Sequence, residues 1–133
     1  MSSIVALDIG ERRIGVAVAS QITKLPHPHS TLDNTMTVWN DIRDLMKEYA
    51  ADTLVVGLPR NLSGDDTAQT TYVRNFVAQA PDLHIVFQDE ALTSRKAEAE
   101  LISRGKPYVK GDIDALAATY ILEDYLHTEG SIK

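Results

Sequence analysis

The sequence predicts an α/β protein with a mixed β-sheet and flanking helices, and two features of the chain support this prediction. The first is an N-terminal hairpin between residues 4 and 20, where two apolar runs flank a short polar turn. The second is a pair of later apolar runs at residues 53–58 and 84–88, each followed by a segment with helical spacing. Hairpin strands pair antiparallel and strands joined through helices pair parallel, so both arrangements should occur in one sheet.

Length and composition indicate one globular domain that covers residues 1–133. Apolar residues make up 44% of the chain, which excludes disorder as the default state. The chain has no cysteine, so disulfides, thiolate metal sites and a cysteine nucleophile are excluded. It shows neither a signal peptide nor an apolar stretch of membrane-spanning length, and we therefore expect a cytoplasmic protein with no membrane partner.

The charge balance limits how the protein could bind nucleic acid. Thirteen Lys and Arg residues against nineteen Asp and Glu residues give a formal net charge of −6. An acidic protein lacks the broad positive surface that attracts a phosphate backbone. Any contact with nucleic acid should therefore come from local basic patches.

The first apolar run, Ile4 to Ile9, contains a single charged residue, Asp8. The runs on both sides of the turn are so apolar that we expect a central strand pair covered on both faces. A carboxylate in such a strand requires a cation, hydrogen-bond donors or a raised pKa. A simpler interpretation is that Asp8 caps backbone N–H groups of the turn around Gly10. Both interpretations remain open at this point.

Residues 21–34 are expected to form a third short strand or edge segment that leads into a loop. His27 and His29 lie there beside two prolines, and we interpret them as part of a surface loop. No further His or Cys lies nearby to complete a metal site. From Thr35 the spacing becomes helical, with a core face that comprises Met36, Trp39, Ile42, Leu45, Met46 and Tyr49.

The second buried strand, residues 53–58, ends at Pro59 and leads into a turn-rich loop over residues 59–66. A loop at the carboxyl end of a parallel strand is where open α/β sheets place their sites. Arg60 in this loop is therefore a candidate phosphate contact, although a solvated surface arginine is an equally good explanation. A helix should follow from about Thr67 to Ala80.

The third buried strand, residues 84–88, is followed directly by Asp89 and Glu90. A helix should then begin at Thr93 or Ser94 and end at Gly105.

A short basic loop is expected next, over residues 106–111. Its lysines, Lys106 and Lys110, could contact a nucleic-acid backbone, or the loop could simply be a linker. The last helix should run from a cap at Asp112 to about His127, with Asp114 in its first turn.

Three carboxylates lie near the ends of these elements. Right-handed crossovers should set the strands after Asp52 and Leu83 beside the first strand, so that Asp8, Glu90 and Asp114 could converge. Taken singly, Glu90 could be a turn residue and Asp114 a helix-dipole acid. Taken together, three carboxylates without cysteine suit Mg²⁺ or Mn²⁺ rather than zinc. Two such ions about 4 Å apart can support phosphodiester cleavage, so the pattern favours a nuclease.

Four segments, in this order and at these separations, resemble the YqgF/RuvX family: LDIGERRIGVAVA, VVGLPRNLSG, QDEALTS and DIDALAATYILEDYL. The resemblance covers nearly the whole chain. It implies an RNase H-like fold with a mixed five-stranded sheet and flanking helices. It also implies a bacterial, cytoplasmic, metal-dependent endonuclease that processes the 5′ end of pre-16S rRNA or acts as a Holliday-junction resolvase.

Carried over by position, the acidic residues of this family fall on Asp8, Glu90 and Asp114. The resemblance therefore implies that these three residues are catalytic and bind Mg²⁺ or Mn²⁺. One departure is Ala91, because the family usually has an arginine after the acidic pair. This departure puts a phosphate contact at that position in doubt, but not the metal site.

Five basic residues are the candidate nucleic-acid contacts: Arg12, Arg13, Arg60, Lys106 and Lys110. The partner would be RNA or branched DNA, with ribosome-associated contacts also open, and the protein could be a monomer or a homodimer. A competing interpretation makes the first hairpin the phosphate loop of an actin-like ATPase, but such ATPases use two domains and 133 residues supply one. The other alternative is a non-catalytic nucleic-acid or ribosome-binding module with the same fold.

Overall fold

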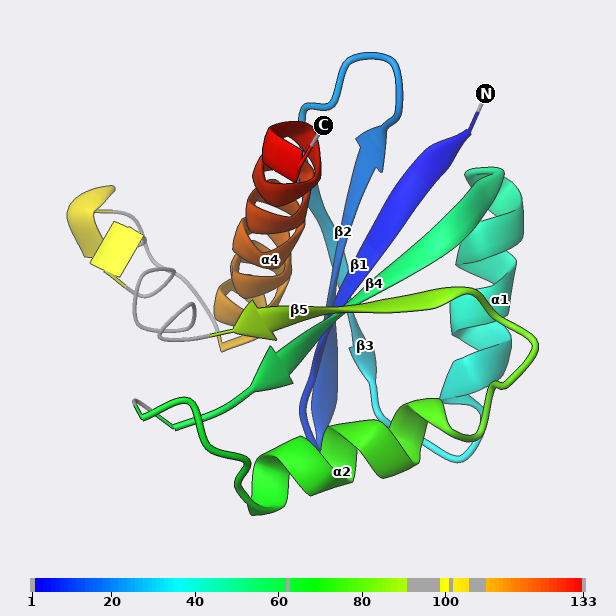
Figure 1. Cartoon of the computed structure of the whole chain (residues 1–133), viewed down its shortest axis with the longest axis vertical. Coiled ribbons are helices and arrows are strands. Elements are labelled where there is room, and N and C mark those ends of the chain that lie inside the picture. The colour runs from blue at the N-terminus through cyan, green and yellow to red at the C-terminus, as the bar shows by residue number, and fades with distance from the viewer. Residues whose placement is uncertain (1, 62, 91–98, 101, 106–109, 133) are drawn as a thin grey trace.

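The computed structural model describes residues 2–61, 63–90, 99–100, 102–105 and 110–132. Within them, five strands form one sheet in the order β3-β2-β1-β4-β5 (Figure 1). The strands are β1 (Ser3–Ile9), β2 (Arg13–Ser20), β3 (His27–Asp33), β4 (Ala51–Pro59) and β5 (Ile85–Glu90). β2 pairs antiparallel with β1 and β3, whereas β4 pairs parallel with β1 and β5. The predicted mixed five-stranded sheet is confirmed, with the hairpin strands β1 and β2 inside it.

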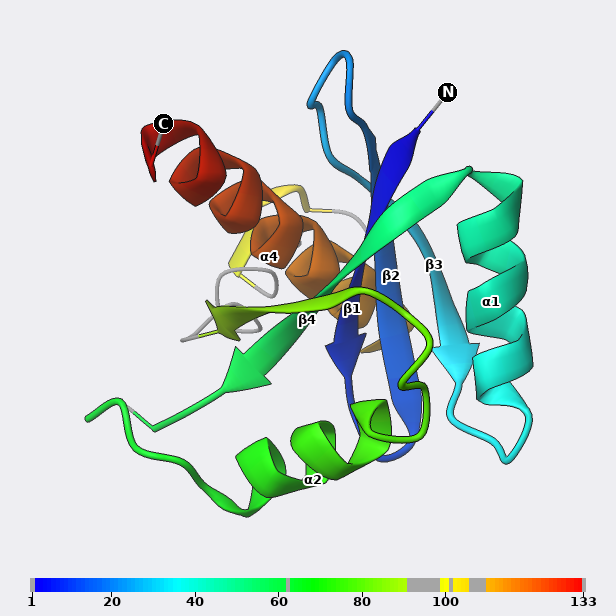
Figure 2. The same ribbon diagram turned by 45° about the vertical axis from the view of Figure 1, so that its right-hand side comes forward.

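Helices cover both faces of this sheet. α1 (Val38–Glu48) and α2 (Ala68–Val77) lie on one face, and α4 (Lys110–Ile132) lies on the other, as Figure 2 shows. None of the described helices is long and apolar enough to cross a membrane.

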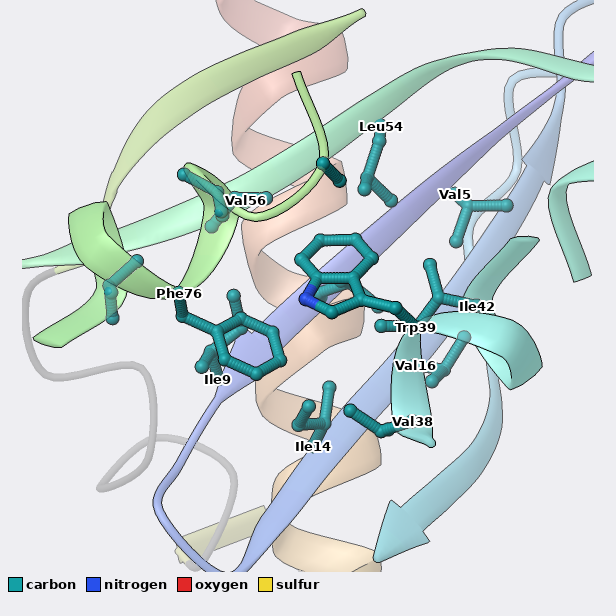
Figure 3. Close-up of a cluster of buried hydrophobic side chains, with 14 of the residues drawn as sticks. Val5, Ile9, Ile14, Val16, Val38, Trp39, Ile42, Leu54, Val56 and Phe76 are labelled. Atoms are coloured by element: carbon teal, nitrogen blue, oxygen red, sulfur yellow. The ribbon is translucent and has the colours of Figure 1, made fainter. Parts of the chain in front are cut away.

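The core under α1 and α2 is built from large side chains. Val5, Leu7 and Ile9, which alternate along β1, all point into it. The stacked rings of Trp39 and Phe76, 5.0 Å apart between centroids, fill the space between the sheet and the two helices (Figure 3). Burying side chains of this size stabilises the fold by about 1.5–3 kcal/mol each.

The core under α4 is built from small side chains instead. The alanines of β1 and β2 on this face are Ala6, Ala17 and Ala19. They leave room for the helix to lie close to the sheet. The approach is tightest at Gly15, where an added Cβ would lie 1.9 Å from the carbonyl oxygen of Asp114. Only glycine fits there, so Gly15 fixes where the start of α4 meets β2.

The position of β5 differs from the prediction. The strand after Leu83 does not lie beside β1, because β2 and β4 already occupy both edges of that strand. β5 lies next to β4 at the edge of the sheet. The strand that carries Glu90 is therefore separated from the strand that carries Asp8 by β4.

The predicted third strand is confirmed as the edge strand β3, but the two histidines lie within it. His27 and His29 lie in the edge strand β3 and not in a surface loop. His29 Nδ1 is 2.8 Å from the Ser30 hydroxyl, and its ring packs edge-on against Tyr49 at 5.3 Å. An edge strand tolerates the proline between the histidines because it does not need every N–H for pairing.

Two helix starts were predicted incorrectly. α1 begins at Val38, so Met36 precedes it and is fully exposed instead of lying in the core. α4 begins at Lys110, so Lys110 belongs to the helix rather than to a loop, and Asp112 lies in the first turn rather than at the cap. α4 also continues past His127 to Ile132. Gly15 of β2 lies against the backbone of Asp114, so this contact fixes the position of the first part of α4 on the sheet.

Other boundaries agree with the sequence more closely. Thr67 caps α2 through a reciprocal capping box with Thr70, although the helix ends at Val77 and not at Ala80. Gly105 has a φ of +68°, as expected for a residue that ends a helix. The predicted caps of the preceding helix, Thr93 and Ser94, lie outside the described residues, as does Ala91.

Candidate active site

Asp8, Glu90 and Asp114 line one cavity of about 270 Å³. Among the described residues, Ile9, Gly10, Pro59 and Gln69 also line it. Its lining residues lie at the carboxyl ends of β1, β4 and β5 and near the start of α4. Figure 1 shows how these elements are arranged. The three acids thus line one cavity although they come from three elements that lie far apart in the sequence.

Strand alternation directs Asp8 into the cavity. Asp8 lies two residues after Ala6, on the face of β1 that α4 covers. Its partner on β2 is Gly15, the residue that admits the backbone of Asp114. One glycine therefore brings the start of α4 against the strand pair that carries Asp8.

Glu90 reaches the same cavity from the edge of the sheet. It is the last residue of β5, and its side chain lies over Gly57 of the intervening strand β4. An added Cβ at Gly57 would be 2.8 Å from Glu90 Oε2. The missing side chain at Gly57 therefore provides the space through which Glu90 approaches Asp8.

The acids perturb one another. Burial raises the pKa of Asp8 well above its ordinary value, and the charge of Glu90, a hydrogen bond with the Glu90 side chain and the charge of Asp114 raise it further. Asp8 is therefore protonated at a higher pH in the folded protein than an ordinary aspartate is.

Asp114 has a different partner. The guanidinium Nε of Arg13 donates a hydrogen bond to Asp114 Oδ2 at 2.8 Å. Arg13, one of the predicted nucleic-acid contacts, is thus bound to one of the predicted acids.

The donor set fits a hard divalent cation in its chemistry, because carboxylate oxygens are the ligands that Mg²⁺ and Mn²⁺ prefer. The described residues contain no group of three His, Asp or Glu side chains already arranged to hold a metal. In this arrangement Asp114 is held by Arg13, while Asp8 and Glu90 are held by each other.

The other predicted basic contacts lie in different surroundings. Arg12 is exposed in the turn between β1 and β2. Arg60 follows β4, and its Nε and Nη1 atoms are 3.3 Å from Asp66 and 3.5 Å from Asp89. Lys106 lies outside the described residues, and only the backbone of Lys110 is described.

Sequence reasoning missed three residues of the site. Gln69 of α2 lines the cavity, and its Nε2 donates to the carbonyl oxygen of Ile9 at 3.2 Å. Gly15 and Gly57 shape the cavity from β2 and β4. The two glycines did carry a signal, because an isolated glycine inside an apolar strand often marks a close approach of another group.

The protein has an RNase H-like fold. RuvC of T. thermophilus, solved in complex with a Holliday-junction substrate, aligns over 97% of both chains with a TM-score of 0.56 at 13% identity. A further Thermus thermophilus RuvC structure aligns over 96% of both chains with a TM-score of 0.52 at 12% identity. At these identities the likeness concerns the fold alone.

Within this fold class, the family model described as RuvX, Holliday junction resolvase, matches residues 2–128, and the chain belongs to this family. A relative from Sulfurihydrogenibium sp. is 39% identical over 95% of this chain and 90% of its own length. A relative from Sodalis glossinidius is 37% identical over 93% of both chains. Both relatives carry the provisional name of pre-16S rRNA nuclease.

Proposed function

We propose that this protein is a metal-dependent nuclease that hydrolyses phosphodiester bonds, with Asp8, Glu90 and Asp114 as its catalytic carboxylates. The observation that carries this proposal is the cavity that the three carboxylates line, in which burial and the neighbouring acids raise the pKa of Asp8. Like charges held together destabilise a metal-free protein, so a purely structural role does not explain them. Membership of a family described by resolvase activity supports the same chemistry.

Mg²⁺ or Mn²⁺ is the proposed cofactor, held by the same three carboxylates. When bound, such ions activate a water molecule and stabilise the leaving oxygen of the phosphodiester. Binding should be weak without nucleic acid, because Mg²⁺ keeps several waters when only a few carboxylates hold it. A tight Zn²⁺ site in the free protein, or a metal bound at His27 and His29, would contradict this part of the proposal.

The residues around the cavity have distinct proposed roles. The hydrogen bond from Gln69 to the carbonyl oxygen of Ile9 would fix the end of β1, the strand that carries Asp8. Arg12, exposed in the neighbouring turn, would bind a substrate phosphate beside the cavity. Further backbone contacts would come from Arg60, Lys106 and Lys110.

The proposed substrate is the precursor of 16S rRNA, cut during maturation of its 5′ end in the cytoplasm. The names of the relatives with 39% and 37% identity support this choice. The second candidate is a branched DNA junction, which the description of the matching family favours. Contacts with the ribosome would accompany the first substrate and not the second.

A cleavage assay separates these possibilities. The protein is incubated with a precursor RNA that spans the 5′ end of 16S rRNA, and in parallel with a four-way DNA junction, in Mg²⁺, in Mn²⁺ or in a chelator. We expect cleavage of the RNA that requires the metal and is lost in Glu90→Gln and Asp114→Asn. The matched control is Asp44→Asn, which removes an exposed acid of α1 on the opposite face of the sheet and should leave cleavage unchanged.

Two other results have clear meanings. Metal-dependent cleavage of the junction alone would support the resolvase function. Binding of nucleic acid without cleavage of either substrate would contradict the proposal and indicate a non-catalytic module.

A further inference from the structure

Arg13 contacts the acidic cluster directly, through its Nε atom 2.8 Å from Asp114 Oδ2. The two side chains are 31% and 22% exposed, so the pair is partly enclosed rather than free in solvent. We propose that Arg13 is an internal counter-cation, which holds Asp114 in the metal-free protein and competes with a divalent cation for that carboxylate. This inference rests on the proposed function, because it concerns the same carboxylates.

Backbone contacts hold this pair together. The N–H of Gly10 donates to the carbonyl oxygen of Arg13 at 2.9 Å, and an added Cβ at Gly10 would lie only 2.8 Å from that oxygen. Two residues after Arg13, Gly15 fits against the carbonyl oxygen of Asp114. The turn and the docking of α4 thus fix both partners at their backbones. A chance pairing of two flexible surface side chains would not have this support.

In the metal-free protein, each of the three carboxyl groups interacts with another side chain of the protein. Arg13 neutralises Asp114, while Asp8 and Glu90 are hydrogen bonded to each other. Among the described residues, no three His, Asp or Glu side chains are arranged as metal ligands. A cation that uses all three carboxylates therefore competes with Arg13 for the charge of Asp114, and this competition reduces the affinity for the cation.

Replacing Arg13 with glutamine removes the competing charge and keeps a polar side chain. Arg13→Gln should bind Mn²⁺ roughly fivefold more tightly than the wild type, which is the upper range for a partly exposed ion pair. The metal-free variant should also unfold at a lower temperature, because three acids remain without their counter-cation. Added Mn²⁺ should then raise its unfolding temperature by more than it raises that of the wild type. Titration calorimetry with MnCl₂ and thermal unfolding measure these two effects without any cleavage assay.

The matched control is Arg12→Gln, which removes the same charge from the same turn without touching Asp114. Its affinity for Mn²⁺ should equal that of the wild type. In an Asp114→Asn background, Arg13→Gln should no longer tighten binding, because the contested carboxylate is gone.

Unchanged or weaker Mn²⁺ binding by Arg13→Gln would overturn the inference and make Arg13 a residue that orients Asp114 for the metal. If Arg13→Gln does not fold, Arg13→Lys gives the test instead. Lysine lacks the planar fork of arginine, so it should hold Asp114 less firmly and give tighter Mn²⁺ binding than the wild type by a smaller factor. Unchanged affinity would overturn the inference here too. A wild-type protein that binds no Mn²⁺ would contradict the metal site itself, which distinguishes failure of the proposed function from failure of the role of Arg13.

Discussion

Asp8 is the residue at which stability and function conflict most directly. Its pKa is raised by burial and by the neighbouring acids, so the folded protein binds a proton there more tightly than the unfolded chain does. The ionised form therefore lowers the free energy of unfolding of the metal-free protein at neutral pH. A residue kept only for stability would not be placed this way.

Asp8→Asn should raise the unfolding temperature of the metal-free protein at neutral pH. The gain should be fully present above the raised pKa and should decline as the pH falls through it. Below about 3.9, the ordinary pKa of aspartate, it should disappear, because Asp8 is then protonated in both the folded and the unfolded states. Thermal unfolding in chelator between about pH 3 and about pH 8 measures this profile, with Asp44→Asn as a control that should change little. A loss of stability at neutral pH would mean that Asp8 is not repelled by its neighbours.

Single residues of the site were predictable where a charged side chain occurs within an apolar segment of the sequence. Asp8 was recognisable as a carboxylate inside an apolar strand, whereas the partner of Arg13 was not. The sequence shows two adjacent arginines in a turn. Because β2 begins at Arg13, the side chain of Arg13 rather than that of Arg12 contacts Asp114 of α4. The roles of Gly15 and Gly57 also depend on what lies above them, which a single sequence does not reveal.

At the scale of elements, the site depends on how closely α4 and β5 approach the strands beneath them. Gly57 of β4 leaves space for the Glu90 carboxylate and for Ile121 of α4. Gly15 of β2 leaves space for the backbone of α4 itself. These two glycines therefore set the geometry of the acids without contacting a substrate.

Gly57→Ala should weaken cleavage by displacing Glu90. The new Cβ would lie 2.8 Å from Glu90 Oε2 and 2.4 Å from Ile121 Cδ1, so both side chains must move, at a cost of about 1–3 kcal/mol in stability. Adding Ile121→Val removes the Cδ1 atom and should restore much of the stability but not the cleavage. Denaturant unfolding and cleavage rates of the single and double variants check this. Recovery of both properties together would show that Glu90 was not displaced.

Gly15→Ala should be more damaging than Gly57→Ala. Its Cβ would lie 1.9 Å from a backbone oxygen of α4, and a backbone cannot move aside as a flexible side chain can. We expect a larger loss of unfolding free energy than for Gly57→Ala, measured in the same denaturant series. A smaller loss would mean that the start of α4 is not fixed at this point.

The elements themselves were largely predictable, since apolar runs and helical spacing identify the strands and the helices α1, α2 and α4. The position of β5 in the sheet was not predictable. The sequence of a connection between two parallel strands does not specify which strand of the sheet the second one will pair with. Met36 was misplaced for a related reason, since its spacing fits the apolar face of α1 although the helix begins two residues later.

For the whole molecule, the net charge of −6 makes the basic residues near the cavity important for substrate binding. They are not equivalent. Arg12 is exposed and makes no ion pair within the described part of the chain, whereas Arg60 already lies between Asp66 and Asp89.

Arg12→Gln should therefore weaken RNA binding and reduce the slope of log affinity against log salt by about one unit, as expected for one lost phosphate contact. Arg60→Gln should reduce it by less, because its charge is already partly neutralised. Changing Lys106 and Lys110 together to Glu should flatten the slope by about one unit for each lost contact. Binding measured at several salt concentrations in an Asp8→Asn background avoids cleavage during the titration. Equal slopes in all variants would place the substrate elsewhere on the molecule.

The central claim is that the three acids form one metal-dependent hydrolytic site, and the cleavage rate of Asp8→Asn under single-turnover conditions tests it most directly. The substrate is the precursor RNA, with saturating Mn²⁺ and a protein whose folding has been verified by thermal unfolding. We expect a loss of at least about a hundredfold, because residues that merely support a metal ligand are already worth about 10–100-fold. Cleavage at the wild-type rate by a folded Asp8→Asn protein would contradict the claim.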